Sequence, residues 1–244
     1  MEHFRFARSG DSALTVEFGS TISPEISDYV LSLDHSLIED PVIGICETIP
    51  TYCSLLVIYQ KSLTSYDKLC TDLRNRIASL NAFSATGAVQ WEIPCCYGSH
   101  FGLDMDEVCE YTGLTQSELI KIHSSADYRI YMLGFLPGFV YLGGMDPRLE
   151  VPRLSTPRTE IPRGSVGIGG RQTGIYPMAS PGGWHLIGCT PLDLYNPDRE
   201  NPVLFKAGDH IRFVPVTSSQ YYDIRQEMLK GTYVPVKHFI GQED

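Results

Sequence analysis

Short strands interrupted by glycine and proline limit the fold of this chain more than any other sequence feature. From residue 127 onward four apolar segments read as strands: YRIYMLGF, SVGIGG, WHLIG and HIRFVPV. Turn residues separate many short strands in this way in antiparallel sheets, whereas parallel sheets need long helical crossovers. The sequence therefore predicts a closed or nearly closed β-barrel over this part of the chain.

The first part of the chain alternates strands with helices. Ser23 and Pro24 are typical of a helix start, and Thr64 or Ser65 opens a second helix with apolar residues on one face. Strands are predicted at residues 13–18, 42–49, 53–59 and 89–94. The order β-α-β-β-α-β favours a split, ferredoxin-like arrangement in which two helices cover one face of a sheet. His35 is expected on the outer side of the first helix.

We therefore predict an α+β protein with two domains. Residues 1–90 form a small ferredoxin-like N-terminal domain, and residues 91–244 form a β-barrel domain that ends in a helix over QYYDIRQEMLKG. The boundary is expected near residues 85–95, with residues 84–87 as a hinge. A length of 244 residues is compatible with either one long domain or two shorter ones.

Two short helices, each with a capping box, are predicted between the strand at residues 89–94 and the barrel strands that begin at residue 127. Asp104 with Glu107 opens the first helix, and Thr115 with Glu118 opens the second. His123, near the end of the second helix, is interpreted as a capping or core residue rather than a ligand.

Charge and composition exclude several classes of protein. A net charge of −10 argues against nucleic-acid binding, which needs a basic face. No apolar run approaches the roughly 18–20 residues that cross a bilayer, and the first residues do not read as a secretion signal. The seven cysteines show no CxxC spacing, so we predict neither a disulfide framework nor a metal site. We expect a cytoplasmic protein without a membrane partner.

The sign of the charge reverses between residues 134 and 188. The basic residues there are all arginines, and they outnumber the acidic ones: Arg148, Arg153, Arg158, Arg163 and Arg171 against Asp146, Glu150 and Glu160. Guanidinium groups hold carboxylate or phosphate at two points, so this segment suggests a pocket for an anionic ligand. Solvated arginines on barrel loops are the alternative.

The run GIGGRQTG at residues 167–174 fails the tests for both common phosphate-binding loops. It lacks the lysine of a Walker loop, and Gln172 stands where the dinucleotide fingerprint needs its third glycine. Its glycines either direct backbone N–H groups at an anion or form a tight barrel corner. Ser180 lacks the first glycine of a nucleophile elbow, so serine hydrolase chemistry is poorly supported.

His185 is the candidate catalytic residue because it is the histidine of the arginine-rich segment and imidazole transfers protons near neutral pH. A hydrogen-bonded structural histidine is the alternative. The apolar run FLPGFVYL is either a core strand or a contact surface for another protein. In the second case the contacts are Phe135, Leu136, Pro137 and Phe139.

Long motifs connect the chain to a known family. YRIYMLGFLPGFVYLGG, QTGIYPMASPGGWHLIGCTP, GDSALTVEFG and FKAGDHIRFVPV closely resemble the KipI / allophanate hydrolase subunit 1 family, which includes 5-oxoprolinase B subunits (PxpB) and carboxyltransferase subdomain C/D. The resemblance covers nearly the whole chain. It implies a small α+β domain followed by a cyclophilin-like β-barrel, without implying prolyl isomerase activity.

The resemblance also implies a function. As a separate subunit, such a chain works with a KipA/PxpC-type subunit and a PxpA-type subunit in an ATP-dependent 5-oxoprolinase that opens 5-oxo-L-proline to L-glutamate. ATP is the implied cofactor of the complex, and the isolated chain is expected to be inactive. One alternative is an inhibitor of histidine kinase autophosphorylation, and another is a carboxyltransferase component acting on a urea-like substrate.

Residue roles follow from this implied chemistry. A phosphorylated lactam that bears a carboxylate requires a cationic pocket, for which Arg158 and Arg163 supply charge. Gln172 and Tyr176 supply directional hydrogen bonds, and His185 supplies a proton. The full predicted substrate-binding set comprises Arg158, Arg163, Gln172, Thr173, Tyr176 and Trp184.

Overall fold

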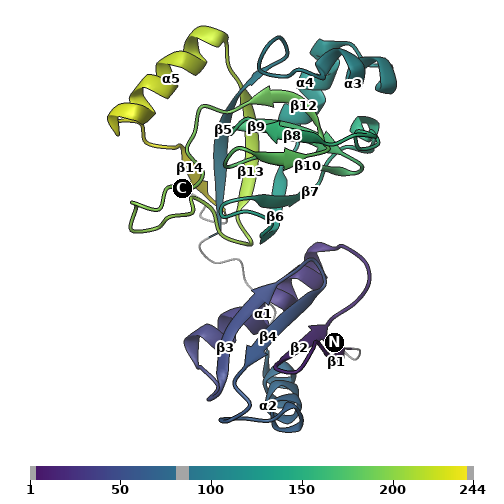
Figure 1. The fold of residues 1–244 in the computed structure, drawn as a ribbon, viewed down its shortest axis with the longest axis vertical. Coiled ribbons are helices and arrows are strands. Elements are labelled where there is room, and N and C mark those ends of the chain that lie inside the picture. Colours follow the sequence, from purple (N-terminus) through teal and green to yellow (C-terminus); the bar gives the residue numbers. More distant parts are fainter. Residues whose placement is uncertain (1–3, 81–87, 241–244) are drawn as a thin grey trace. The chain divides into compact units, whose positions relative to one another are not determined.

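The computed structural model describes residues 4–80 and 88–240 (Figure 1). The chain divides into two compact units, residues 1–85 and 86–244. Each unit is described by itself below. The expected hinge at residues 84–87 lies outside the described residues.

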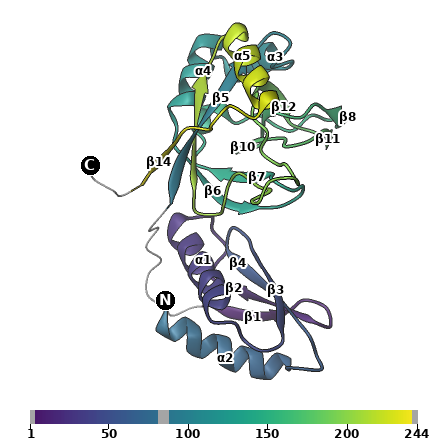
Figure 2. The ribbon, with the colours of Figure 1, turned by 90° about the vertical axis from the view of Figure 1, so that its left-hand side faces the viewer.

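The N-terminal unit is a four-stranded antiparallel sheet with two helices. The strands follow the order β1-β2-β4-β3, and the elements are β1 (Arg5–Arg8), β2 (Ala13–Glu17), α1 (Pro24–Glu39), β3 (Ile45–Pro50), β4 (Ser54–Tyr59) and α2 (Tyr66–Ser79). Leu14 and Val16 of β2 are buried in one cluster with Leu33 of α1 and Leu73 of α2. Both helices therefore cover the same face of the sheet (Figure 2), because apolar residues alternate along its strands.

The predicted helix starts in this unit are confirmed. The Ser23 hydroxyl accepts a hydrogen bond from the Ile26 N–H, and Ser65, not Thr64, caps α2 through the Lys68 N–H. His35 is exposed, as expected, with its side chain 59% accessible. The α+β class is likewise confirmed.

The predicted strand at residues 89–94 does not belong to the N-terminal sheet. It is part of β5 (Val89–Tyr97), the centre of the sheet in the second unit, and β1 completes the N-terminal sheet instead. A domain boundary between residues 90 and 91 would cut β5. Much of β5 is buried, including both apolar Ile93 and Cys95, which suits a central strand of a barrel better than an edge strand.

The second unit is built on an eight-stranded sheet in the order β10-β9-β12-β5-β13-β6-β7, with β14 paired to β5. The strands of this sheet are β6 (Tyr128–Leu133), β7 (Val140–Gly143), β9 (Ser165–Gly169), β10 (Gln172–Ile175), β12 (His185–Cys189), β13 (His210–Pro215) and β14 (Lys237–Phe239). A separate two-stranded antiparallel sheet contains β8 (Arg158–Ile161) and β11 (Ser180–Gly182).

The two ends of the eight-stranded sheet approach each other. A Cβ atom added to Gly174 of β10 would lie 3.2 Å from the Val140 carbonyl oxygen of β7. The sheet is therefore nearly closed, which confirms the predicted barrel. Its interior holds one large apolar cluster that includes Ile93, Ile130 and Phe213.

Helices α3 (Met105–Thr112) and α4 (Gln116–Ser125) pack on the barrel, and α5 (Ser218–Lys230) is the predicted terminal helix (Figure 1). Thr115 and Glu118 form the predicted capping box of α4. The predicted box at Asp104 is wrong, because the Asp104 side chain makes no cap hydrogen bond. Its carboxylate binds groups from distant strands instead, as described below.

His123 is a core residue, which agrees with the sequence interpretation. Its side chain is fully buried, with Nδ1 2.7 Å from the Tyr97 hydroxyl and Nε2 2.9 Å from the Thr173 hydroxyl. Since the Thr173 hydroxyl donates to the Gly167 carbonyl, it accepts from Nε2–H, and Nδ1 accepts from Tyr97. The neutral ring is thus satisfied at both nitrogens. Burial lowers the pKa of His123 to about 3.

We expect His123 to make the barrel sensitive to acid. Between pH 6.5 and about 3 the unfolded chain binds a proton at His123 that the folded chain rejects, so stability is complete above this window and falls as pH falls. The loss is about 1.4 kcal/mol per pH unit in the free energy of unfolding. Urea titrations at several pH values measure this slope. In His123→Gln the dependence of the free energy of unfolding on pH should be weaker by about one proton taken up on unfolding. An equal pH dependence in the variant would contradict the assignment of this effect to His123.

All seven cysteines are free thiols, as the sequence predicts. Among the described residues, no helix combines the length and the apolar character that a membrane span requires.

Candidate functional site

A small aromatic hollow on the barrel unit is the candidate binding site. Its volume is about 140 Å³, and it is lined by Phe135, Phe139, Tyr141, Arg153, Tyr176, Pro181, Gly182, Gly183 and Trp184. The ring of Phe139 lies at the base, with ring centroids 5.7 Å from Tyr176 and 5.8 Å from Trp184. Edge-to-face contacts of this kind fix the orientation of each ring.

Two glycines make room for the rings of this hollow. A Cβ atom at Gly169 would lie 2.2 Å from Cδ1 of Trp184, and one at Gly182 would lie 2.5 Å from the Tyr176 hydroxyl. Gly170, at φ +63°, forms the turn between β9 and β10. The glycine-rich run is therefore a hairpin that packs beneath Trp184, which corresponds to the barrel-corner alternative of the sequence analysis.

Arg153 is the cation of the hollow. Its guanidinium lies 5.9 Å from the centre of the Trp184 ring, and it has no carboxylate partner among the residues that the structure describes. Burial raises the pKa of Tyr176 above its ordinary value, with Arg153 opposing the effect. Tyr176 therefore keeps its proton at neutral pH and can donate a hydrogen bond. Arg153 appeared in the sequence only as one of several arginines, so no motif singled it out.

Arg158 lies beside the hollow but is already paired. In the β8–β11 ladder it lies opposite Gly182, and its two terminal nitrogens donate to the Asp104 carboxylate at 2.9 and 2.6 Å. Asp104 also accepts from the Leu186 N–H at 2.6 Å, and its side chain is only 6% exposed. The predicted role of Arg158 as a free charge for substrate is thus not supported by this geometry, since the pair neutralises it.

His185 lies next to this ion pair rather than in the hollow. It is the first residue of β12, directly after Trp184, and unlike Trp184 it does not line the hollow. Nδ1 of His185 is 3.8 Å from a carboxylate oxygen of Glu107. The structure therefore separates the predicted proton donor from the aromatic residues that it was expected to serve.

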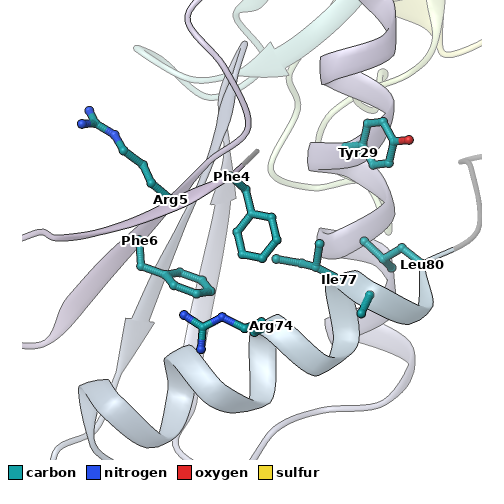
Figure 3. A pocket seen from close by; sticks show the side chains of 8 residues that line it. Phe4, Arg5, Phe6, Tyr29, Arg74, Ile77 and Leu80 are labelled. Carbon is teal, nitrogen blue, oxygen red and sulfur yellow. The ribbon is translucent and has the colours of Figure 1, made fainter. Parts of the chain in front are cut away.

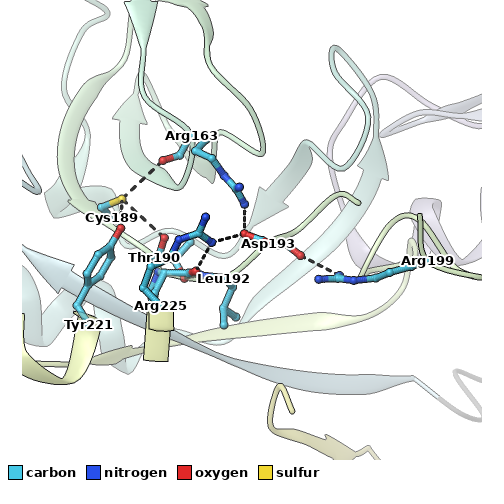
Figure 4. Close-up of polar contacts among 9 residues, drawn as sticks. Arg163, Cys189, Thr190, Leu192, Asp193, Arg199, Tyr221 and Arg225 are labelled. Atoms are coloured by element: carbon cyan, nitrogen blue, oxygen red, sulfur yellow. Dashed lines mark hydrogen bonds and ion pairs between the residues drawn. The ribbon is translucent and has the colours of Figure 1, made fainter. Parts of the chain in front are cut away.

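Arg163 belongs to a different cluster (Figure 4). It forms an ion pair with Asp193, which is also paired with Arg225, and Arg199 donates to the Asp193 carbonyl at 2.9 Å. Cys189 and Tyr221 lie beside this network, 3.4 Å apart at sulfur and oxygen. Arg158 and Arg163, both predicted to supply charge to the ligand, each bind a different aspartate in the structure.

Two further predicted residues lie away from the hollow. Thr173 is fully buried, and its hydroxyl is used by His123 and Gly167, so it has no exposed atom for a substrate. Gln172 is half-buried at the start of β10, and it does not line the hollow.

Of the predicted contact residues, Phe135 and Phe139 line the hollow, whereas Leu136 and Pro137 do not. Phe135 is 61% exposed and has a φ of +60°, a strained conformation for an aromatic residue, and Pro137 is also exposed. Leu136 is half-buried. Phe139 is 3% exposed, so it is a core residue and not available to a partner.

A second hollow lies in the N-terminal unit (Figure 3). Its volume is about 580 Å³, and it is lined by Phe4, Arg5, Phe6, Tyr29, Arg74, Ile77, Ala78 and Leu80. Arg5 is paired with Glu17, and the Arg74 guanidinium packs 5.3 Å from the centre of the Phe6 ring. Its lining contains no carboxylate or imidazole, so we assign no chemistry to it.

Comparisons with known proteins agree with this architecture. The 5-oxoprolinase B subunit of Bacillus subtilis is 39% identical over 92% of this chain and 98% of its own length. The structure of TTHA0988 matches 84% of this chain at a TM-score of 0.76 and 34% identity, although this chain spans only 40% of that protein. The Kluyveromyces lactis urea amidolyase has the same fold over 96% of this chain and 16% of its own length, at a TM-score of 0.79 and 22% identity.

The fold defines a two-part α+β protein with a small aromatic hollow on a nearly closed barrel. The model of the family "carboxyltransferase domain, subdomain C and D" matches residues 4–205. The chain therefore belongs to the carboxyltransferase subdomain C and D family and, within it, to the group of 5-oxoprolinase B subunits. This confirms the family resemblance of its long motifs.

Proposed function

We propose that this chain is the B subunit of a multi-subunit 5-oxoprolinase that uses ATP and water to convert 5-oxo-L-proline to L-glutamate. The observation that carries the proposal is the aromatic hollow with Arg153 at its edge. 5-Oxoproline is a small five-membered lactam that bears one carboxylate. Its ring suits the aromatic walls, and its carboxylate suits an arginine without another anionic partner. The similarity to a 5-oxoprolinase B subunit over almost the whole chain supports the same activity.

Tyr176 completes the recognition of the lactam in this proposal. Because burial keeps its hydroxyl protonated, Tyr176 donates a hydrogen bond to the lactam carbonyl oxygen while Arg153 holds the carboxylate. Such a donor stabilises the negative charge that develops on this oxygen when the amide is activated. Trp184 and Phe139 exclude water from one side of the ring.

ATP is bound elsewhere in the complex under this proposal. The hollow, at about 140 Å³, is smaller than the roughly 300–1,000 Å³ of pockets for drug-sized ligands. It accommodates a small acid but not a nucleotide. The chain is therefore inactive alone and needs KipA/PxpC-type and PxpA-type subunits.

The rim of the hollow at Phe135 is our proposed contact with one of these subunits. Phe135 is 61% exposed, Pro137 two residues further on is exposed as well, and burial of such an aromatic side chain by a partner stabilises a complex. A subunit that covers this rim would also close the hollow over its ligand.

The test is ADP release by this chain, purified with its native partner subunits, with and without 5-oxoproline. We expect stimulation by 5-oxoproline in the complex and none with the isolated chain. In a second arm, Phe135→Asn, which tolerates the positive φ, should reduce co-purification of the partner, whereas Tyr111→Asn on the exposed side of α3 should not.

The absence of stimulation in a complex shown to contain all three subunits would contradict the proposed function. Inhibition of histidine kinase autophosphorylation by the isolated chain would then be measured as the alternative. Unchanged co-purification of the Phe135 variant would remove the rim from the interface and leave the enzymatic proposal intact.

A further inference from the structure

We propose that Asp104, Glu107 and His185 form a binding site for one divalent transition-metal ion. Each residue offers one ligand atom, and these three atoms lie within 4.8 Å of one another. The site is distinct from the aromatic hollow, because none of the three residues lines that hollow. It adds a binding function to the chain that does not depend on the proposed 5-oxoprolinase activity.

The unpartnered nitrogen of His185 is the observation that points to a ligand. His185 is only 6% exposed, and its Nδ1 atom is buried without a hydrogen-bond partner among the described residues. A buried polar atom left unsatisfied destabilises the protein, whichever tautomer the ring adopts. A metal ion bound to Nδ1 would satisfy it. The neighbouring carboxylate of Glu107, 3.8 Å away, lies at the distance expected when a cation separates two ligands.

The distances fit metal coordination after a small movement of one side chain. Ligands at about 2.1 Å from a tetrahedral ion lie roughly 3.5 Å from each other. Glu107 is 62% exposed and can rotate, whereas Asp104 and His185 are held in place by the protein. The ion therefore binds to two fixed ligands and one that closes on it.

The start of α3 and its hydrogen bonds to β12 bring these three ligands together. Asp104 immediately precedes α3 and Glu107 lies in its first turn, so the two carboxylates share one side of the helix start. The Asp104 N–H donates to the Leu186 carbonyl, and the Leu186 N–H donates to the Asp104 carboxylate, so this helix start is joined to β12, next to His185. Residues far apart in the sequence thereby meet at one point.

Arg158 and the Leu186 N–H orient the Asp104 carboxylate. Arg158 donates to both oxygens, and Leu186 donates to Oδ2, so Oδ1 retains a lone pair among the described contacts. Metal-binding carboxylates commonly have such outer partners. Two carboxylates against one guanidinium also leave a net negative charge at the site, which favours a cation.

The donor set indicates the class of metal. Imidazole nitrogen favours zinc, iron, nickel or copper, whereas magnesium and calcium prefer sites made of oxygen ligands alone. Three protein ligands leave a coordination position open for water or a small ligand, as in metal sites that do more than stabilise a fold. We therefore use zinc as the probe, with cobalt as its spectroscopic substitute.

The test is zinc titration by calorimetry of the untagged, chelator-treated full chain. We expect one zinc ion per chain, at least about tenfold weaker binding in Glu107→Gln, and loss of this binding in His185→Gln. Glu110→Gln, an exposed glutamate one turn further along α3, is the matched control and should bind like the wild type. Because Glu107 is exposed, its variant tests the site even if the His185 variant does not fold.

Zinc binding by cysteine thiolates is the competing explanation of a positive titration, and the absorption spectrum of bound cobalt distinguishes the two kinds of site. Cobalt bound to nitrogen and oxygen lacks the thiolate-to-metal charge-transfer absorption that cysteine ligands produce. The expected spectrum has ligand-field bands without that absorption. The proposal is overturned if no zinc binds, if Glu107→Gln binds as tightly as the wild type, or if the cobalt spectrum shows thiolate ligands.

Discussion

Replacing Asp104 with alanine is expected to lower the free energy of unfolding by about 3 kcal/mol, the lower end of the range for breaking a buried ion pair. The carboxylate is 6% exposed and accepts three hydrogen bonds, two from Arg158 and one from the Leu186 N–H. Its removal leaves a buried backbone donor unsatisfied and a guanidinium without its partner. The effect stays at the lower end because Arg158 is 29% exposed and can turn toward water.

Chemical denaturation of matched variants measures this effect. Asp106→Ala, at the neighbouring exposed acid of α3, should change stability by less than about 0.5 kcal/mol. Arg158→Met alone should lower the free energy of unfolding by less than Asp104→Ala does. The double variant should lower it by less than the sum of the two single effects, because the two residues contact each other. A stability of Asp104→Ala equal to that of the wild type would show that the Asp104 carboxylate does not hold the start of α3 on β8 and β12.

Replacing Arg153 with glutamine is expected to lower kcat/KM for 5-oxoproline about 10- to 100-fold in the assembled complex. A hydrogen bond between charged groups is worth about 1.5–3 kcal/mol, and each 1.36 kcal/mol corresponds to a factor of ten. If Arg153 holds the carboxylate equally in the ground and transition states, the loss appears mainly in KM. The folded structure should be unaffected, because Arg153 is an exposed residue whose guanidinium lies over Trp184.

Steady-state ADP release against 5-oxoproline concentration measures this loss. Arg171→Gln is the control, since Arg171 is 76% exposed and lies 3.6 Å from Glu150, outside the lining of the hollow. Equal kcat/KM values for the wild type and Arg153→Gln would remove Arg153 from the binding site, whatever the activity of the complex.

Local signals in the sequence predicted the helices well. The capping box of α4 and the Ser23 cap of α1 both form, because a cap needs only groups within one helical turn. The capping box at Asp104 fails although its sequence is equally good. Arg158, 54 residues away, and Leu186 offer a charged and a backbone donor that replace the helix N–H groups.

Strand partners could not be predicted in the same way. Residues 89–94 were recognised as a strand, but a strand's sequence does not specify which sheet it joins. β5 pairs with β12, β13 and β14, all far along the chain, and the choice depends on burial inside the barrel. The same limit applies to Thr173, whose hydroxyl meets His123 only in the folded barrel.

Sequence alone determined the α+β class, the two-part organisation, the barrel-forming half, the family, and the segment that carries the aromatic hollow. These features are encoded in local periodicity, turn residues and long motifs. Only the tertiary structure decided which arginine remains available to a ligand. Arg158 and Arg163 are paired with Asp104 and Asp193, whereas Arg153 faces the hollow. Side chains of one type are equivalent in a sequence, and they become different only when folding gives each of them particular neighbours.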